Sequence, residues 1–346
     1  MAAIIGRHKE GSFSRITLLT LLTATILLFF SCYEKEVNIT PQPHEVTIGI
    51  AWRSDTDSEF LTNIQSAFSS IGVKTVLLPQ VVDNDIHYTS GQVSVECIDQ
   101  NDVLIQQWAD MVKQHTYTHS NVAEAVKGVV AVVFTGGEDI APTLYRTPQP
   151  WHAIEAEKDY NATRDINDYL LMSYCIDQNI PIAGFCRGAQ MLGIVSGGTI
   201  IQDIPTWFAD QGIPYRYTHR NKKSTPQSYR DYAPHDVTVT PGSWLAKFAG
   251  TTTINNAPSW HHQCLETVDT QHLRVTGITH TEGFDFIEAI ERTDCSLAIG
   301  MQFHPEAAIA KHQSGAANET SFMDYIQSQA IFRNFVHQSI QVMQGR

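Results

Sequence analysis

The residues best suited to chemistry lie in Gly184-Phe185-Cys186-Arg187-Gly188, where a cysteine stands between two glycines. An apolar run over 180–185 precedes it and a helical pattern over 188–195 follows, which predicts a strand, a sharp turn and a helix. Such a turn crowds the backbone and favours neighbours without a Cβ. It also sets the cysteine at a helix N-terminus, where the dipole favours a thiolate. The pattern favours a nucleophile, and a core cysteine beside packing glycines is the alternative.

A second chemical pattern follows the apolar segment Ala298-Ile299-Gly300-Met301 and reads Gln302-Phe303-His304-Pro305-Glu306. Pro305 biases His304 toward extended geometry, in which residues i and i+2 point to the same side. His304 and Glu306 could then act as a base and the carboxylate that orients it, completing a Cys-His-Glu triad with Cys186. A plain strand followed by a polar turn is the alternative.

Together these motifs resemble class I glutamine amidotransferase-like hydrolases, and most of all the γ-glutamyl-γ-aminobutyrate hydrolase branch, also called peptidase family C26. The resemblance extends over roughly 45–337 and includes further motifs in the same order: Phe134-Thr135-Gly136-Gly137-Glu138-Asp139, Arg164-Asp165, Gly197-Gly198-Thr199 and Ser259-Trp260-His261-His262-Gln263. It implies hydrolysis of γ-glutamyl amides without a cofactor or a metal ion.

The remaining site residues follow from the chemistry and from this resemblance. An oxyanion needs preorganised N–H donors, for which we predict the backbone of Gly137 and of Arg187. The resemblance implies that Gln190, His262 and Gln263 line the pocket and hold the γ-glutamyl portion.

Three positions depart from the family pattern. Asp168 stands where a Glu is usual after Arg164-Asp165, Leu192-Gly193 where Leu-Asn is frequent, and Glu282-Gly283-Phe284-Asp285-Phe286 where Asp-Gly commonly precedes a strand. Any of them could alter the acceptor side of the pocket.

Short apolar segments alternate with helical patterns along the domain. Strands are predicted over 46–52, 74–78, 129–134 and 180–185, and helices over 56–71, 165–178 and 188–195. This alternation predicts an α/β fold: a mostly parallel sheet with helices on both faces, flavodoxin-like, with ligands at the carboxyl ends of the strands. Residues 82–127 exceed a simple connection and are interpreted as an insertion or lid.

The N-terminal residues indicate export. Basic residues precede an apolar run over 16–30 that is too short to span a bilayer, and Ser31-Cys32 follow. We predict a lipoprotein signal peptide over 1–31, lipidation of Cys32, a polar tether over 32–44 and the hydrolase domain over 45–346. The protein would then be lipid-anchored in the bacterial cell envelope, on the periplasmic or cell-surface side. A plain signal peptide or an uncleaved anchor is the alternative.

Charge and cysteine content exclude other classes of function. The chain has 23 Lys and Arg against 36 Asp and Glu, with no basic patch, so nucleic-acid binding is not expected. Cys97, Cys175, Cys264 and Cys295 show no disulfide framework, and we expect mostly buried free thiols. The chain contains no Cys-x-x-Cys, and adjacent His261 and His262 would point apart in a strand, so neither suggests a metal site.

Three functions stay open from the sequence: a γ-glutamyl hydrolase acting on a small molecule or peptide, a glutamine amidotransferase subunit supplying ammonia to a separate synthetase, and a catalytically silent binding lipoprotein. The chain carries no synthetase domain that the motifs reveal, and a cell-surface location would separate it from ATP-using partners. Both considerations favour hydrolysis.

Overall fold

The computed structural model describes residues 42–225, 232–315 and 322–346. The predicted signal peptide, the predicted lipidation site Cys32 and nearly all of the tether lie outside these residues. Within the described ranges, no helix has both the length and the apolar character needed to cross a membrane.

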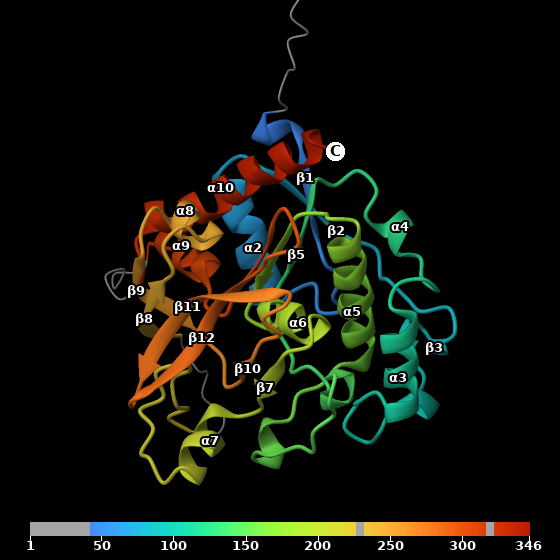
Figure 1. Cartoon of the computed structure of the whole chain (residues 1–346). Coiled ribbons are helices and arrows are strands. Elements are labelled where there is room, and N and C mark those ends of the chain that lie inside the picture. The colour runs from blue at the N-terminus through green and yellow to red at the C-terminus, as the bar shows by residue number, and fades with distance from the viewer. Residues whose placement is uncertain (1–41, 226–231, 316–321) are drawn as a thin grey trace, which may run out of the picture. The chain divides into compact units, whose positions relative to one another are not determined.

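One large mixed sheet organises the domain, with strand order β2-β1-β5-β6-β13-β12-β11-β8-β9 (Figure 1). Neighbouring strands from β2 to β13 pair in parallel, and those from β13 to β9 pair antiparallel. The strands are β1 Thr47–Ile50, β2 Lys74–Leu77, β5 Ala131–Phe134, β6 Ile182–Phe185, β8 Ala233–Val239, β9 Thr253–Ser259, β11 Leu273–Thr281, β12 Phe284–Arg292 and β13 Ala298–Met301. Two small antiparallel sheets pair β3 Tyr88–Thr89 with β4 Gln92–Val93, and β7 Thr199–Ile201 with β10 Cys264–Thr267.

Helices cover both faces of the sheet. Successive side chains of β5 point to opposite faces and all are buried, so both faces must be covered. Val132 and Phe134 pack into the apolar core under α5 and α6, and Ala131 and Val133 into the core under α2, α8, α9 and α10. Figure 1 shows α5 and α3 on one side and α8, α9 and α10 on the other. The helices are α2 Glu59–Ser70, α3 Gln106–His115, α4 Val122–Ala125, α5 Ala162–Asp177, α6 Arg187–Val195, α7 Ile204–Asp210, α8 Trp244–Ala249, α9 Pro305–Gln313 and α10 Tyr325–Gln344. Short 3-10 turns occupy η1 Pro43–Glu45, η2 Val95–Cys97, η3 Pro142–Leu144 and η4 Glu155–Glu157. The predicted α/β fold with helices on both faces is confirmed, with an antiparallel extension at one edge.

The segment 82–127 folds into β3, β4, η2, α3 and α4. Its buried residues Leu104, Ala109 and Val112 join the apolar core that α5 also contributes to. The Lys113 ammonium donates to the carbonyl oxygen of Thr143 over 2.9 Å, which ties α3 to η3. The segment is therefore packed against the parallel half of the sheet, and a lid role for it stays a prediction.

Candidate active site

Cys186 occupies a strained turn between β6 and α6. It is the N-cap of α6 with φ 50° and ψ −106°, a conformation that residues with a Cβ rarely adopt. A Cβ on Gly184 would lie 2.5 Å from the backbone of Gly188, and one on Gly188 would lie 2.5 Å from the carbonyl oxygen of Phe134. Both glycines are thus required by close packing, and the predicted strand, sharp turn and helix are confirmed.

His304 and Glu306 form a buried pair, although not by the extended geometry that the sequence predicted. That expectation is wrong beyond His304, because α9 begins at Pro305 and His304 is its N-cap. Proline suits the first position of a helix, where no N–H partner is required. Glu306 in the first turn still places Oε1 2.6 Å from Nδ1 of His304. The carboxylate therefore fixes which ring nitrogen carries the proton.

The His304 ring is held between aromatic side chains. Phe60 stacks on it with ring centroids 5.4 Å apart, and Tyr232 meets it edge-on at the same 5.4 Å. Burial opposes the charged imidazolium, but Glu306 and the Cys186 sulfur outweigh it and raise the pKa of His304 to about 10. Nε2 makes no hydrogen bond of normal geometry within the described residues. Glu306 and the Cys186 sulfur thus both favour the imidazolium form of His304.

This raised pKa predicts how stability depends on pH. Since the pKa of His304 is about 10 in the folded state against 6.5 for an ordinary histidine, its contribution is fully present below pH 6.5. The contribution is lost as the pH rises toward about 10. We expect the free energy of unfolding, measured by urea denaturation, to fall more steeply over this window in the wild type than in His304→Asn. Parallel pH profiles for the two proteins would contradict the assignment.

The glycine loop after β5 is shaped by two buried arginines. Gly137 has φ 147°, and a Cβ there would lie 1.9 Å from Nη1 of Arg164. Nη2 of Arg164 donates to the carbonyl oxygen of Gly136 over 2.8 Å, and Nη1 of Arg53 donates to the same oxygen over 3.1 Å. Because the Gly136 carbonyl is held toward the arginines, the following N–H is available on the other side of the peptide. Arg53 was not predicted from the sequence.

The Arg187 side chain is buried under the turn, so the role that we predict for this residue in the oxyanion hole falls to its backbone N–H. The guanidinium donates to Asp165 over 2.6 Å and to Asp168 on α5. Its N–H belongs to the first turn of α6, where helices leave N–H groups without an internal partner. Asp168, the departure from the family Glu, is therefore used in this ion pair and does not line the pocket.

Replacing Gly137 by alanine should damage catalysis more than folding. The added Cβ would meet the Arg164 guanidinium and displace the loop whose N–H we expect to bind the oxyanion. Loss of one oxyanion donor typically lowers kcat by roughly 10²–10³-fold. Steady-state kinetics of Gly137→Ala on a γ-glutamyl amide measures this, with Gly72→Ala as the control, because Gly72 also has positive φ and has open space around its Cβ direction. Equal losses in both variants would contradict the role of the loop.

One cavity of about 280 Å³ is lined by the predicted site residues Cys186, Gly137, Gln190, His262 and Gln263. The structure thus brings these five residues together. Nε2 of Gln190 donates to the carbonyl oxygen of Gln263 over 3.0 Å, so Gln190 supports the pocket wall. The side-chain amide of Gln263 is buried and neither its nitrogen nor its oxygen has a partner among the described residues. Gln263 therefore has both a donor and an acceptor to offer a bound molecule.

His262 is less available than predicted. Its Nδ1 lies 3.0 Å from Oδ1 of Asp203 and its Nε2 lies 3.1 Å from Oδ1 of Asp139. Burial opposes protonation, but these carboxylates outweigh it and raise the pKa of His262. The ring thus holds Asp139, which lines the same cavity, and Oδ2 of Asp139 is buried without a hydrogen-bond partner among the described residues. Asp139 belonged to the quoted glycine-loop motif, yet its role was missed.

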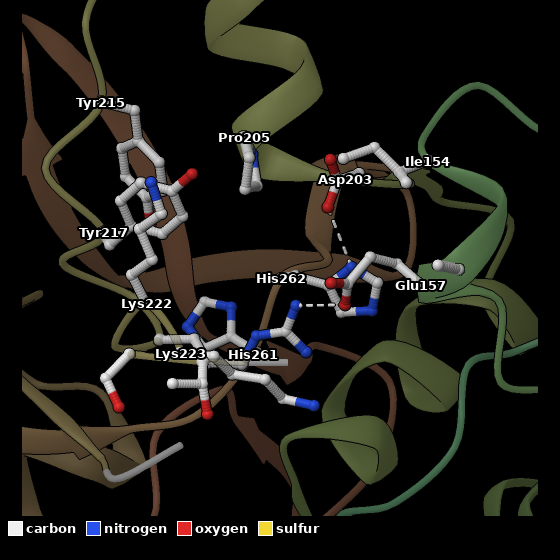
Figure 2. A pocket seen from close by; sticks show the side chains of 14 residues that line it. Ile154, Glu157, Asp203, Pro205, Tyr215, Tyr217, Lys222, Lys223, His261 and His262 are labelled. Atoms are coloured by element: carbon white, nitrogen blue, oxygen red, sulfur yellow. Dashed lines mark hydrogen bonds and ion pairs between the residues drawn. The ribbon is translucent and has the colours of Figure 1, made fainter. Parts of the chain in front are cut away.

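A second cavity of about 500 Å³ adjoins the first, since His261, His262, Glu157 and Arg220 line both. Figure 2 shows Asp203 bonded to His262 at one wall, with Tyr215, Tyr217 and Lys222 on the opposite wall. The larger cavity provides room beyond the reacting centre for a second part of a substrate.

The other two departures from the family pattern, at Gly193 and at Glu282-Gly283, are explained by packing and by a turn, and the four cysteines besides Cys32 and Cys186 are free thiols. A Cβ on Gly193 would lie 2.2 Å from a terminal methyl of Leu265, so a side chain at this position, where asparagine is frequent, would require Leu265 to move. Glu282 and Gly283 both have positive φ and make the tight turn between β11 and β12. Cys97, Cys175 and Cys264 are buried and Cys295 is partly buried, all as free thiols, as predicted.

These features are those of a class I glutamine amidotransferase-like α/β protein: the mixed sheet, the strained turn at Cys186 and the buried His304–Glu306 pair. The peptidase C26 family model matches residues 104–306, and the chain belongs to this family. Protein NtpR of Enterococcus hirae is 30% identical over 197 residues, 57% of this chain and 73% of that protein. A putative glutamine amidotransferase of Schizosaccharomyces pombe is 29% identical over 60% of this chain and 76% of its own length. The γ-glutamyl-γ-aminobutyrate hydrolase PuuD of Escherichia coli K12 is 28% identical over 43% of this chain and 55% of its own length.

Among solved structures, a putative GMP synthase component from Thermoplasma acidophilum superposes with a TM-score of 0.47 at 15% identity, over 86% of this chain and 96% of that chain. A glutamine amidotransferase from Thermotoga maritima gives a TM-score of 0.45 at 12% identity, over 86% of this chain and 98% of that chain.

Proposed function

We propose that this protein hydrolyses γ-glutamyl amide bonds through Cys186, His304 and Glu306. The observation that carries the proposal is the strained Cys186 turn, which opens into the same cavity as Gly137 and lies against a His304 ring oriented by Glu306. A merely structural cysteine requires neither the strained backbone nor a charged imidazole partner.

The reaction follows from these positions. The Cys186 thiolate attacks the amide carbon, and the developing oxyanion is bound by the N–H groups of Gly137 and Arg187. The His304 imidazolium gives its proton to the leaving amine as the C–N bond breaks, which forms a γ-glutamyl thioester. His304, now neutral, takes a proton from the water that attacks the thioester; the C–S bond breaks, glutamate is released, and the Cys186 thiolate and the His304 imidazolium are regenerated. Glu306 orients the ring throughout.

The charges around the cavity support an amino-acid head group as the bound portion. The unpaired Asp139 oxygen suits an ammonium group, and Arg220, 2.8 Å from Glu157 at the cavity wall, suits a carboxylate. The Gln263 amide can bind either one. The leaving amine would then extend into the adjoining cavity beside Tyr217 and Lys222.

A panel of γ-glutamyl amides that includes glutamine tests this function. Hydrolysis of several amides with release of glutamate supports the hydrolase. Activity confined to glutamine, and stimulated by a separate synthetase, would favour an amidotransferase subunit instead. Binding without turnover of any amide would favour a silent binding lipoprotein.

We further propose that the protein is lipid-anchored in the cell envelope through Cys32, with no nucleic-acid partner. The order of basic residues, apolar run, Ser31-Cys32 and polar tether motivates the proposal. Several acyl chains on one cysteine would bind the protein stably to a membrane, whereas a single chain gives only marginal binding, since each buried methylene contributes ~0.8 kcal/mol.

Cys32→Ala should therefore abolish lipid modification and leave a precursor or a wrongly cleaved form. Mass spectrometry of the mature N-terminus checks this, and the wild type should begin with a modified Cys32. An unmodified first residue other than Cys32 in the wild type would refute the anchor and leave the hydrolase proposal untouched.

A further inference from the structure

Three histidines surround one buried carboxylate at the antiparallel half of the sheet. Glu288 lies on β12 and has no exposed surface, and His219, His235 and His261 approach it from a loop, from β8 and from the loop between β9 and β10. His261 also lines the cavity that contains Cys186, whereas Glu288, His219 and His235 are not among its lining residues. No sequence motif pointed to Glu288, His219 or His235.

Three atoms of this cluster form a nearly equilateral triangle. Nδ1 of His219 lies 3.4 Å from Nε2 of His261 and 3.4 Å from Oε1 of Glu288, and the latter two atoms are 3.5 Å apart. Ligands bound to zinc at about 2.0–2.1 Å in a tetrahedron lie roughly 3.3–3.4 Å from one another. The spacing therefore matches one face of a metal coordination tetrahedron and is long for direct hydrogen bonds.

The hydrogen bonds on the far side of the rings fix their tautomers. Nδ1 of His261 donates to the carbonyl oxygen of Gln263 over 2.8 Å, and Nδ1 of His235 donates to that of Thr218 over 3.1 Å. A neutral ring that donates from Nδ1 presents a lone pair at Nε2. Nε2 lies 3.2 Å from Oε2 of Glu288 in His235 and 3.5 Å from Oε1 of Glu288 in His261. Metal-binding histidines show this same pattern, in which the second nitrogen donates to a carbonyl group.

Glu288 lies in ion-pair range of the three histidines but has no hydrogen bond of good geometry to any described residue. Neither oxygen of Glu288 makes a hydrogen bond within the described residues, and Nε2 of His235, 3.2 Å from Oε2, also makes none. Phe286 packs edge-on against the His219 ring with centroids 5.1 Å apart, and Oγ1 of Thr281 lies 3.2 Å from Nε2 of the same ring. A buried carboxylate beside neutral imidazoles is unfavourable unless a positive charge, either a proton on one ring or a bound cation, lies beside it.

We propose that Nδ1 of His219, Nε2 of His261 and Oε1 of Glu288 bind one divalent transition-metal ion of the zinc type. His235, beside the second carboxylate oxygen, is the candidate fourth ligand. Imidazole nitrogen with a single carboxylate suits zinc better than magnesium or calcium, which prefer oxygen. The ligands come from separate segments of the chain, which is why no short sequence motif revealed them.

The ion would have a structural role for the pocket. His261 is followed directly by His262 and Gln263, which line the substrate cavity, whereas Glu288 belongs to the sheet. A metal bridge between His261 and Glu288 would fix this loop against β12.

Metal analysis of the full-length protein in detergent tests the proposal. The protein is stripped with a chelator, incubated with Zn²⁺, freed of unbound ion by gel filtration and measured by plasma mass spectrometry. We expect one zinc per chain in the wild type and a loss of at least tenfold in Glu288→Gln, which keeps the side-chain shape. Zinc should also raise the Tm of the wild type and leave that of Glu288→Gln unchanged.

Asp85→Asn is the matched control, because Asp85, His115 and His119 form an exposed group whose ligand atoms also lie close together. It should retain full zinc content. Absence of zinc from the wild type, or loss of zinc in Asp85→Asn alone, would overturn the proposal. X-ray absorption at the zinc edge of the wild type keeps the test decisive if Glu288→Gln does not fold: nitrogen and oxygen ligands at about 2.0–2.1 Å support the site, and sulfur ligands refute it.

Discussion

Cys186→Ala and Cys186→Ser should reduce the hydrolysis of γ-glutamyl amides by roughly 10⁴–10⁶-fold, the size of loss seen when a triad nucleophile is removed. Alanine has no attacking atom, and a serine hydroxyl is a far weaker nucleophile than a thiolate beside an imidazolium. Both side chains fit the volume of cysteine, so circular dichroism and thermal unfolding should match the wild type. Steady-state kinetics gives the rates.

Cys295→Ser is the control, because Cys295 is a partly buried free thiol that does not line the substrate cavity. It should retain wild-type activity. Turnover that survives in a folded Cys186→Ala protein would show that the strained turn serves another purpose.

His304→Ala should lower kcat by about 10⁵-fold, and Glu306→Gln by about 10³-fold. The ring transfers protons in both halves of the reaction, whereas Glu306 acts on it through one 2.6 Å hydrogen bond to Nδ1. Glutamine preserves the shape but removes the charge that favours the imidazolium. The ratio of the kcat loss in His304→Ala to that in Glu306→Gln therefore distinguishes the contribution of proton transfer by the ring from that of its orientation by the carboxylate.

His272→Ala, at an exposed histidine paired with Asp294, is the matched control and should leave kcat unchanged. KM should change little in either triad variant, because neither side chain binds the γ-glutamyl head group. A loss in Glu306→Gln as large as that in His304→Ala, with both proteins folded, would mean that the carboxylate does more than orient the ring.

The parallel half of the fold and the cysteine turn were predictable because their signals are local. Apolar runs next to helical patterns marked β5, β6 and α6, and Gly184 is required by a 2.5 Å approach to the backbone of Gly188 within the same strand-turn-helix unit. Each signal rests on residues a few positions apart, so periodicity and turn chemistry suffice.

The parts that were missed depend on contacts between distant segments. Arg53 reaches the glycine loop across 83 positions, and His262 reaches Asp139 across 123. No periodicity links such pairs. The antiparallel strands β8, β9, β11 and β12 escaped notice for a related reason, since their pairing is set by packing within the sheet. At Pro305 the local signal was misread: proline ends one helix but begins another equally well.

Covalent labelling tests the central claim most directly. An electrophilic γ-glutamyl analogue is incubated with the full-length protein, and the modified peptide is located by mass spectrometry. The account predicts one label, on Cys186, with Cys97, Cys175, Cys264 and Cys295 unmodified, and loss of that label when excess substrate competes. Labelling at a different cysteine, with hydrolysis surviving in Cys186→Ala, would contradict it.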